Sequence, residues 1–221
     1  KGFPARIAVA HEITEDTWHC RYEWLAQFLK AHKNEKILVI CHAQADILEA
    51  ESYLWQKHGL DAALFHEGMN LVERDRAAAY FANLEDGAQV LLCSEIGSEG
   101  RNFQFSHNLV CLDLPDHPDV LEQRIGRLDR IGQKHDVNIH IPFAPASKGA
   151  LQFHWFNEVL HCIAEQNPAA GVVHDEYWPQ LDQAGDNTAI FAAAKAKVAQ
   201  LKQAISEGRD ALLEMNSCRE P

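Results

Sequence analysis

The hydrophobic pattern of the chain alternates short apolar runs with longer segments in which apolar and charged residues mix. Five of the runs have the continuous apolar character of strands that are buried on both faces of a parallel sheet. We therefore predict strands at 36–41, 62–65, 89–93, 108–112 and 137–141.

Helical spacing is found between the predicted strands. In 45–57, apolar residues such as Ile47 and Leu54 recur at helical intervals among charged ones, and Gly59 follows as a stop signal. The segment 71–84 is charged early and apolar late, which is typical of an amphipathic helix.

A third helix is predicted at 120–131. Leu121, Ile125 and Leu128 lie at positions i, i+4 and i+7 and would form one buried stripe. Pro118 lies near the start of this helix, where a missing N–H has no cost.

Strands that alternate with helices predict βαβ units, and therefore an α/β domain whose parallel sheet is covered by helices on both faces. We place this domain at 22–145, after an N-terminal segment at 1–21. Ligands of such sheets bind at the carboxyl ends of the strands, so the chemistry is expected on the loops that follow them.

The alternation ends after Pro145. Helices are predicted at 151–165 and from about 188 to 216, around a break at 167–171. We therefore expect a mainly helical extension over 146–221, whose apolar residues pack on the α/β domain or on a further part of the protein.

Charge limits the partners that the chain can bind. Twenty Lys and Arg against 32 Asp and Glu leave a net charge of −12, which repels phosphate backbones, so nucleic-acid binding would need a local site. No stretch approaches the ~18 apolar residues of a membrane span, and no cleavable leader is recognisable. We predict a cytoplasmic protein without membrane contact, and a fragment of a longer chain because Lys1 stands in place of Met.

Cysteine and histidine spacing argues against a metal site. The six Cys include no CxxC pair, and they are predicted as buried thiols in a reducing compartment. None of the 13 His forms an HxxxH or HExxH pair with acidic support, so no metal ligands are assigned.

The loop after the third predicted strand, 94–102, contains Gly97 and Gly100. Glycines three residues apart permit close backbone approach and expose N–H donors, which suits a phosphate. The alternative is a turn that needs glycine for its dihedral angles alone. The loop has neither the lysine of a phosphate-binding loop nor a dinucleotide-binding pattern.

The segment 123–133 holds Arg124, Arg127 and Arg130 at a spacing of three. Next to the buried stripe, Arg124 is predicted at its margin, while the other two rotate away from it. Two guanidinium groups on one short helix could bind the γ-phosphate of a nucleotide offered by a facing domain. Because the chain has no phosphate-loop lysine, it would supply only half of a nucleotide site.

These segments resemble the conserved motifs of superfamily 2 helicase-like ATPases. The segment 123–133 resembles motif VI, and its Arg-Ile-Gly-Gln ending has the form found in the SWI/SNF (Snf2) family. The supporting segments are 91–103 for motif V, 36–41 for motif IV, and 65–68 with 73–74 after it. Within the family, the likeness is to its bacterial RNA-polymerase-associated members and covers most of the chain after about Arg21.

The resemblance implies a RecA-like second lobe, with ATP and Mg²⁺ held mainly by a first lobe that precedes it. Arg127 and Arg130 are then the catalytic arginine fingers, a contribution on the order of 10³–10⁵ in rate. The implied ATP-binding residues are Gln123, Gly100 and Asn102. The implied nucleic-acid-binding residues are His42, His66, Gly68, Ser94 and Gly97.

The function implied by the resemblance is ATP-dependent translocation on double-stranded DNA that releases and recycles RNA polymerase, with the fragment alone inactive. The alternative is a catalytically silent scaffold that docks polymerase. Eukaryotic members usually have other residues at Glu95, Arg124 and Asp129, so the family contacts are not transferred to these three positions.

Overall fold

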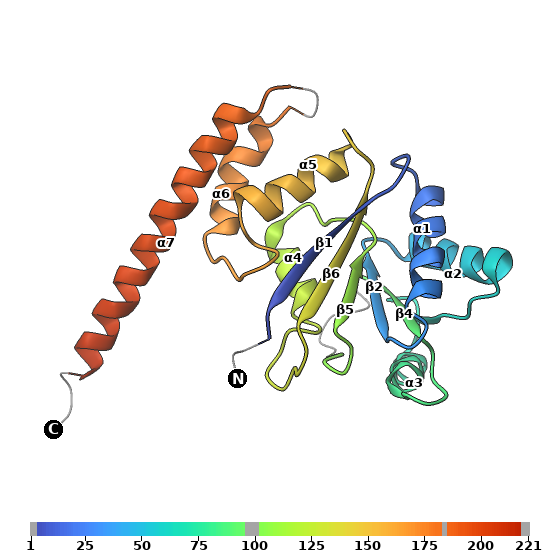
Figure 1. Ribbon diagram of the computed structural model, residues 1–221. Coiled ribbons are helices and arrows are strands. Elements are labelled where there is room, and N and C mark those ends of the chain that lie inside the picture. Colours follow the sequence, from blue (N-terminus) through green and yellow to red (C-terminus); the bar gives the residue numbers. More distant parts are fainter. Residues whose placement is uncertain (1–3, 96–101, 183–184, 218–221) are drawn as a thin grey trace.

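The computed structural model describes residues 4–95, 102–182 and 185–217, with side chains up to residue 208. Within these ranges, six strands form one sheet in the order β1-β6-β5-β2-β4-β3, and every neighbouring pair is parallel (Figure 1). The sheet confirms the predicted α/β class. Its strands are β1 (Arg6–Glu12), β2 (Ile37–Cys41), β3 (Ala63–Phe65), β4 (Val90–Ser94), β5 (Asn108–Cys111) and β6 (Val137–Phe143).

The edge strand β1 has no counterpart among the predicted strands. It pairs with β6 along its whole length, from Arg6 opposite Val137 to Glu12 opposite Phe143. Its sequence RIAVAHE mixes charged and apolar residues, and only Arg6 among them is fully buried. An edge strand that is half exposed lacks the continuous apolar character by which the five central runs are recognisable.

Successive residues of the central strands point to opposite faces of the sheet, and each face has its own core. Ile37, Val39 and Cys41 pack under α1 (Trp18–Ala31) and α2 (Gln44–His58). The alternate residues Leu38 and Ile40 belong to a second core. That core is covered by α3 (Leu71–Ala82), α4 (Pro118–Ile125) and the C-terminal helices (Figure 1).

Local capping signals set the helix ends. Gly59 ends α2 in the left-handed conformation, with φ of 62°, as predicted. Asn70 and Glu73 form a capping box at the start of α3.

Helix α4 ends at Ile125, so the prediction of a helix as far as residue 131 is wrong. The chain after Ile125 turns more tightly, since Arg127 N–H donates to the carbonyl of Arg124 and Leu128 N–H to that of Ile125. The carbonyl of Arg127 accepts the N–H of Phe103 at 2.8 Å, which directs the chain toward the loop before β5. Arg127 and Arg130 therefore lie in turns beyond the helix.

The C-terminal part is helical, as predicted, but its first helix is shorter. Helix α5 (Lys148–His154) passes into a π-helical turn, η1 (Trp155–Val159). It is followed by α6 (Ala170–Tyr177), a short 3₁₀ turn, η2 (Trp178–Gln180), and α7 (Thr188–Ser217). Trp155 and Phe156 are fully buried in the core.

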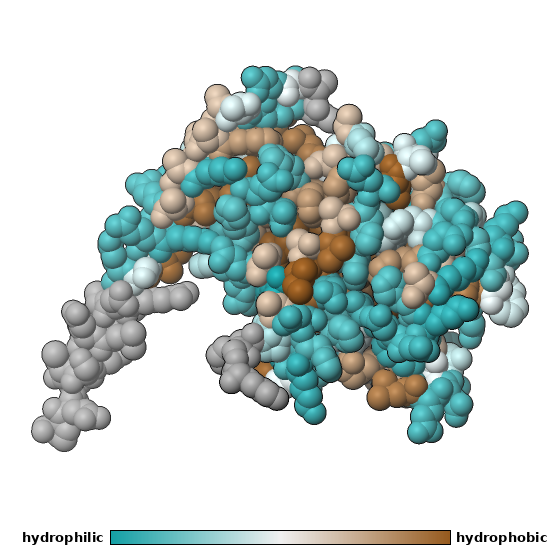
Figure 2. Space-filling view, in the orientation of Figure 1, coloured by the Kyte–Doolittle hydropathy of each residue, from teal (hydrophilic) through white to brown (hydrophobic). Residues whose placement is uncertain are grey.

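The face of the molecule in Figure 2 is mostly hydrophilic. Of the helices in the described ranges, none combines the length and the apolar composition that crossing a membrane requires.

Candidate functional site

The predicted nucleic-acid residues follow three adjacent strands at the carboxyl edge of the sheet. Cys41, which precedes His42, lies opposite Ser94 in the β2–β4 ladder. Phe65, which precedes His66, lies opposite Cys93 in the β3–β4 ladder. The parallel register thus brings the three loops to one edge, as the sequence pattern predicts.

Ser94 is fully buried, and its hydroxyl donates a short hydrogen bond, 2.5 Å, to a carboxylate oxygen of Glu67. This hydrogen bond lowers the pKa of Glu67. A phosphate could use the hydroxyl of Ser94 only after the carboxylate had moved. Nothing in the hydrophobic pattern identifies Glu67, because its partner lies 27 residues away.

The turn at Gly68 is narrow. A Cβ atom there would lie 2.8 Å from the amide nitrogen of Gln44 and 3.1 Å from Nδ1 of His66, so a larger residue would require the Gln44 side chain to move. His66 is 8% exposed, and its Nδ1 accepts the Gly68 N–H. Arg74 fixes the same turn, because it donates to the carbonyls of Met69 and Glu67, both at 3.0 Å.

The residues predicted to bind ATP are only partly described. Gly100 lies outside the described residues, as does Gly97 of the predicted nucleic-acid-binding set. Asn102 is exposed, and its side chain interacts with Gln104, accepting the backbone N–H at 3.1 Å. Gln123 is exposed on α4.

Arg127 and Arg130 differ in their surroundings. Arg127 is 8% exposed and lies near the thiol of Cys93, whose pKa is raised by burial and lowered in part by the arginine charge. Arg130 is exposed, and its Nε donates to the carbonyl of Gly126 at 2.8 Å. The two arginines follow α4 rather than project from it, so the predicted presentation from one helix is wrong, while their role toward ATP remains a prediction.

Gln133 holds the end of this arginine-bearing segment in place. Its amide nitrogen donates to the carbonyls of Gln104, Ser106 and Leu128, all at 3.1 Å. Its amide oxygen accepts the N–H groups of Lys134 and His135. All these groups are backbone groups of the turns around the segment, so the side chain of Gln133 holds these turns together.

Arg124 lies inside the protein, so its predicted place at the margin of the stripe is wrong. It is 1% exposed and forms ion pairs with Glu95 and Asp113. Asp129 forms an ion pair with Arg6 at 2.5 Å. All three positions that differ from the eukaryotic pattern, namely Glu95, Arg124 and Asp129, therefore take part in ion pairs within this lobe.

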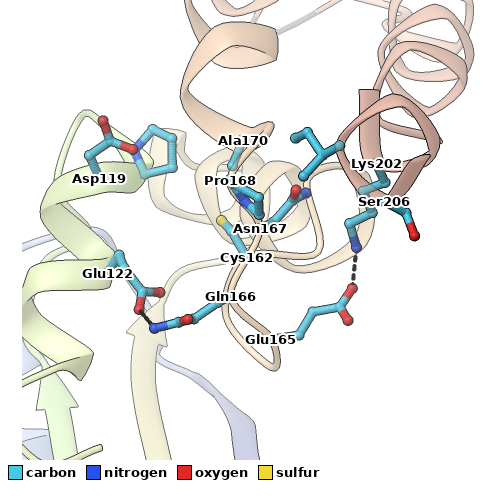
Figure 3. A pocket seen from close by; sticks show the side chains of 12 residues that line it. Asp119, Glu122, Cys162, Glu165, Gln166, Asn167, Pro168, Ala170, Lys202 and Ser206 are labelled. Atoms are coloured by element: carbon cyan, nitrogen blue, oxygen red, sulfur yellow. Dashed lines mark hydrogen bonds and ion pairs between the residues drawn. The ribbon is translucent and has the colours of Figure 1, made fainter. Parts of the chain in front are cut away.

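A cavity of about 810 Å³ lies between α4, the loop before α6, and α7 (Figure 3). Its rim contains two hydrogen-bonded pairs, Gln166 with Glu122 at 2.8 Å and Lys202 with Glu165 at 2.5 Å. None of the residues predicted to bind ATP or nucleic acid lines it. The cavity is therefore separate from the candidate site at the carboxyl edge of the sheet.

Buried cysteines in the described part of the chain are thiols with raised pKa values. Burial raises the pKa of Cys111 to about 11 and that of Cys162 to about 12. Among the described residues, no three His, Cys, Asp or Glu side chains are grouped as metal ligands. Cys218 lies outside the described residues.

Two family models match the chain. The helicase conserved C-terminal domain matches residues 20–132, and the RNA polymerase recycling family C-terminal region matches residues 136–221. A curated relative, RNA polymerase-associated protein RapA of Vibrio vulnificus (strain YJ016), is 49% identical over 224 residues, which is 97% of this chain and 23% of the relative. The chain thus spans about a quarter of that protein's length.

Solved structures support the RecA-like fold. A DEAD box protein from the hyperthermophile Methanococcus jannaschii superposes with a TM-score of 0.54 at 23% identity, over 69% of this chain and 39% of that one. The C-terminal part of the Fun30 ATPase domain superposes with a TM-score of 0.51 at 16% identity, over 84% of this chain and 57% of that one. At these identities the likeness concerns the fold alone.

Proposed function

Because the chain belongs to the family of helicase conserved C-terminal domains, we propose that it is the second RecA-like lobe of a SWI/SNF-type ATPase that associates with RNA polymerase. The observation that carries this proposal is the 49% identity to RNA polymerase-associated protein RapA, which extends over 97% of the chain. The full-length protein would move along double-stranded DNA, and this motion would release and recycle polymerase in the cytoplasm.

ATP would bind between this lobe and a first lobe that holds the phosphate loop and Mg²⁺. On this lobe, Arg130 and Gln123 are exposed and could reach a nucleotide without rearrangement of the core. Arg130 makes no ion pair with any residue of the described part. Its guanidinium can therefore offer donors to the γ-phosphate, where charge develops during phosphoryl transfer. Arg127, Gly100 and Asn102 would complete this side of the site.

Nucleic acid would bind at the carboxyl edge of the sheet. His42 is exposed at this edge, and Ser94 lies opposite the preceding residue, Cys41, in the ladder. We assign phosphate contacts to His42, His66, Gly68, Ser94 and Gly97. Because the chain carries a net charge of −12, the attraction must be local, and the first lobe must share the contacts with DNA.

The test compares ATP hydrolysis by the full-length protein with that of this chain, each with and without duplex DNA and RNA polymerase. We expect hydrolysis by the full-length protein, stimulation by DNA, and none by this chain alone. A full-length protein that binds polymerase but hydrolyses no ATP would support the silent scaffold instead. Hydrolysis by this chain alone would contradict its assignment as a second lobe.

A further inference from the structure

We propose that Arg124 is a positioning residue that couples the loops expected to contact DNA to the helix expected to contact ATP. The inference rests on the proposed function. It starts from an unusual feature of the core, a charged side chain that is 1% exposed and is one of the largest fully buried side chains described.

The guanidinium of Arg124 contacts two of the loops at the carboxyl edge of the sheet. Toward the loop after β4, Nε donates to the carboxylate oxygens of Glu95 at 2.9 and 3.1 Å, and Nη2 contacts the nearer one as well. Toward the loop after β5, Nη1 donates to the backbone carbonyl of Asp113 at 2.6 Å and to its Oδ1 at 3.1 Å.

A third loop is attached through Asp113. Its second carboxylate oxygen, Oδ2, accepts the backbone N–H of His42 at 3.2 Å. Asp113 therefore lies between the loop after β2 and the guanidinium of Arg124. Both predicted DNA contacts are thus linked to the same buried arginine. His42 is linked through the carboxylate of Asp113, and Ser94 is linked through Glu95, the next residue in the chain.

The other end of this connection is helix α4, which carries Gln123 next to Arg124. Burial lowers the pKa of Arg124, but the hydrogen bonds that it donates to Glu95 and the charge of Asp113 outweigh this effect and raise it above the ordinary value. The side chain is therefore charged at every physiological pH. A phosphate that displaces either loop must move the guanidinium, and with it α4, or separate buried opposite charges.

Arginine is suited to this connection, because its planar fork binds two carboxylates in fixed directions. A lysine ammonium is a single point of charge and cannot reproduce both contacts. The substitution Arg124→Lys keeps the charge and removes the geometry. Glu95→Gln keeps the shape of the partner, whose side chain is 18% exposed, and removes its charge.

The experiment measures ATP hydrolysis by the full-length protein, without DNA and with saturating duplex DNA, for Arg124→Lys, Glu95→Gln and the double variant. We expect the stimulation by DNA to fall by about ten-fold in each single variant while the basal rate and the KM for ATP change by less than about two-fold. The double variant should lose no more than Arg124→Lys, because both substitutions break one connection.

Arg21→Lys is the matched control. Arg21 is also a buried arginine, 8% exposed, and is also ion-paired, with Asp16, but its other hydrogen bonds go to the carbonyls of Leu112 and Pro142 and none goes to Glu95, Asp113 or His42. DNA stimulation should be normal in this variant. A thermal melt of each protein establishes that it is folded, and Glu95→Gln remains a test if Arg124→Lys does not fold.

Two results would overturn the inference in distinguishable ways. A wild-type protein that hydrolyses ATP without any response to DNA would overturn the proposed function, and the coupling with it. The coupling alone would be overturned if DNA stimulates the wild-type protein and the variants keep this stimulation. The same holds if the variants lose the basal and the stimulated rates in equal proportion.

Discussion

Arg6 at the start of β1 binds the carboxylate of Glu122 on α4 with both of its terminal nitrogens. Nη1 donates to Oε2 at 2.6 Å, and Nη2 donates to Oε1 at 2.7 Å. Its Nε donates to Asp129 at 2.5 Å, beyond the end of the helix. One residue of the edge strand thus connects to both ends of the segment that carries Arg124 and Arg127, although 116 residues separate it from Glu122.

We predict that Arg6→Met lowers the free energy of unfolding by about 2 kcal/mol, because the charged hydrogen bonds of the guanidinium are lost. The loss is limited because methionine keeps most of the apolar stem and because solvent screens the two carboxylates that remain. The Arg6 side chain is 5% exposed, and those of Glu122 and Asp129 are 35% and 29% exposed. Urea denaturation measures the effect. Lys148→Met, which breaks the exposed ion pair with Asp116, should change stability much less. Equal effects of the two substitutions would contradict the prediction.

The second prediction concerns pH. Burial lowers the pKa of His140 to about 3, from 6.5 for an unperturbed histidine, while His11 and Asn108 bind its ring nitrogens at 3.0 and 3.2 Å. The unfolded chain therefore binds a proton near pH 6.5 that the folded chain does not. Stability is lost as the pH falls below 6.5, by up to about 2.5 kcal/mol for this group on reaching about pH 4.5.

Urea denaturation at several pH values checks this. His140→Gln should show a shallower loss of stability below pH 6.5 than the wild type, because glutamine does not titrate. His19→Gln replaces an exposed histidine and should leave the wild-type pH dependence in place. The same slope in His140→Gln as in the wild type would show that other groups cause the acid sensitivity.

A third prediction concerns the attachment of the C-terminal helices. The Trp155 indole is fully buried, and its Nε1 donates to Nδ1 of His174 on α6 at 3.1 Å. Burial lowers the pKa of His174 to about 4, so its ring is neutral and can accept this bond. We expect Trp155→Phe to cost about 1–3 kcal/mol, from the lost hydrogen bond and the space left by the smaller ring.

Thermal or urea denaturation measures this cost. Trp55→Phe serves as the control, since Trp55 on α2 is 60% exposed, and its substitution should change stability by less than about 0.5 kcal/mol. If Trp155→Phe leaves the stability unchanged, the indole N–H and the extra ring volume do not hold α6 in place.

The fourth prediction tests the arginine fingers in the full-length protein. Arg130→Ala should lower kcat by a factor on the order of 10³ with a normal melting curve, because Arg130 is exposed and, in the proposed function, stabilises the transition state rather than the packing. Arg127 is 8% exposed, so Arg127→Lys is the variant of choice there, and its melting curve must be compared. Arg76 is an exposed arginine on α3, and Arg76→Ala should leave kcat for ATP hydrolysis unchanged. Near-normal rates in both finger variants would refute the assignment.

The central strands could be predicted because burial on both faces leaves a continuous apolar run in the sequence. The register of these strands then placed His42, His66 and Ser94 at one edge of the sheet, as expected for a parallel α/β fold. The strand β1 carries no such signal, because it lies at the edge of the sheet and all of its residues after Arg6 are half-buried or exposed.

The burial of Arg124 could not be predicted for a different reason. Charged residues are rarely buried unless they are paired, and the pairing with Glu95 joins positions 29 residues apart. Helical periodicity reports only which side of a helix is apolar, and by that criterion Arg124 lies at the boundary. The early end of α4 is likewise not encoded in the local pattern, since the hydrogen bond from the Phe103 N–H to the carbonyl of Arg127 is a tertiary contact.

Helix α7 has 30 residues, which at ~1.5 Å per residue amounts to a length of about 45 Å. Its first half is anchored, since Ala194 and Val198 pack in the core and Lys202 pairs with Glu165, whereas its last turns extend beyond the sheet (Figure 1). A helix fixed at one end acts as a lever arm. A tilt of roughly 10° about Lys202 would move Ser217, about 22 Å further along the helix axis at ~1.5 Å per residue, through about 4 Å, so a small angular change in the lobe becomes a displacement of several ångströms at the last described turn.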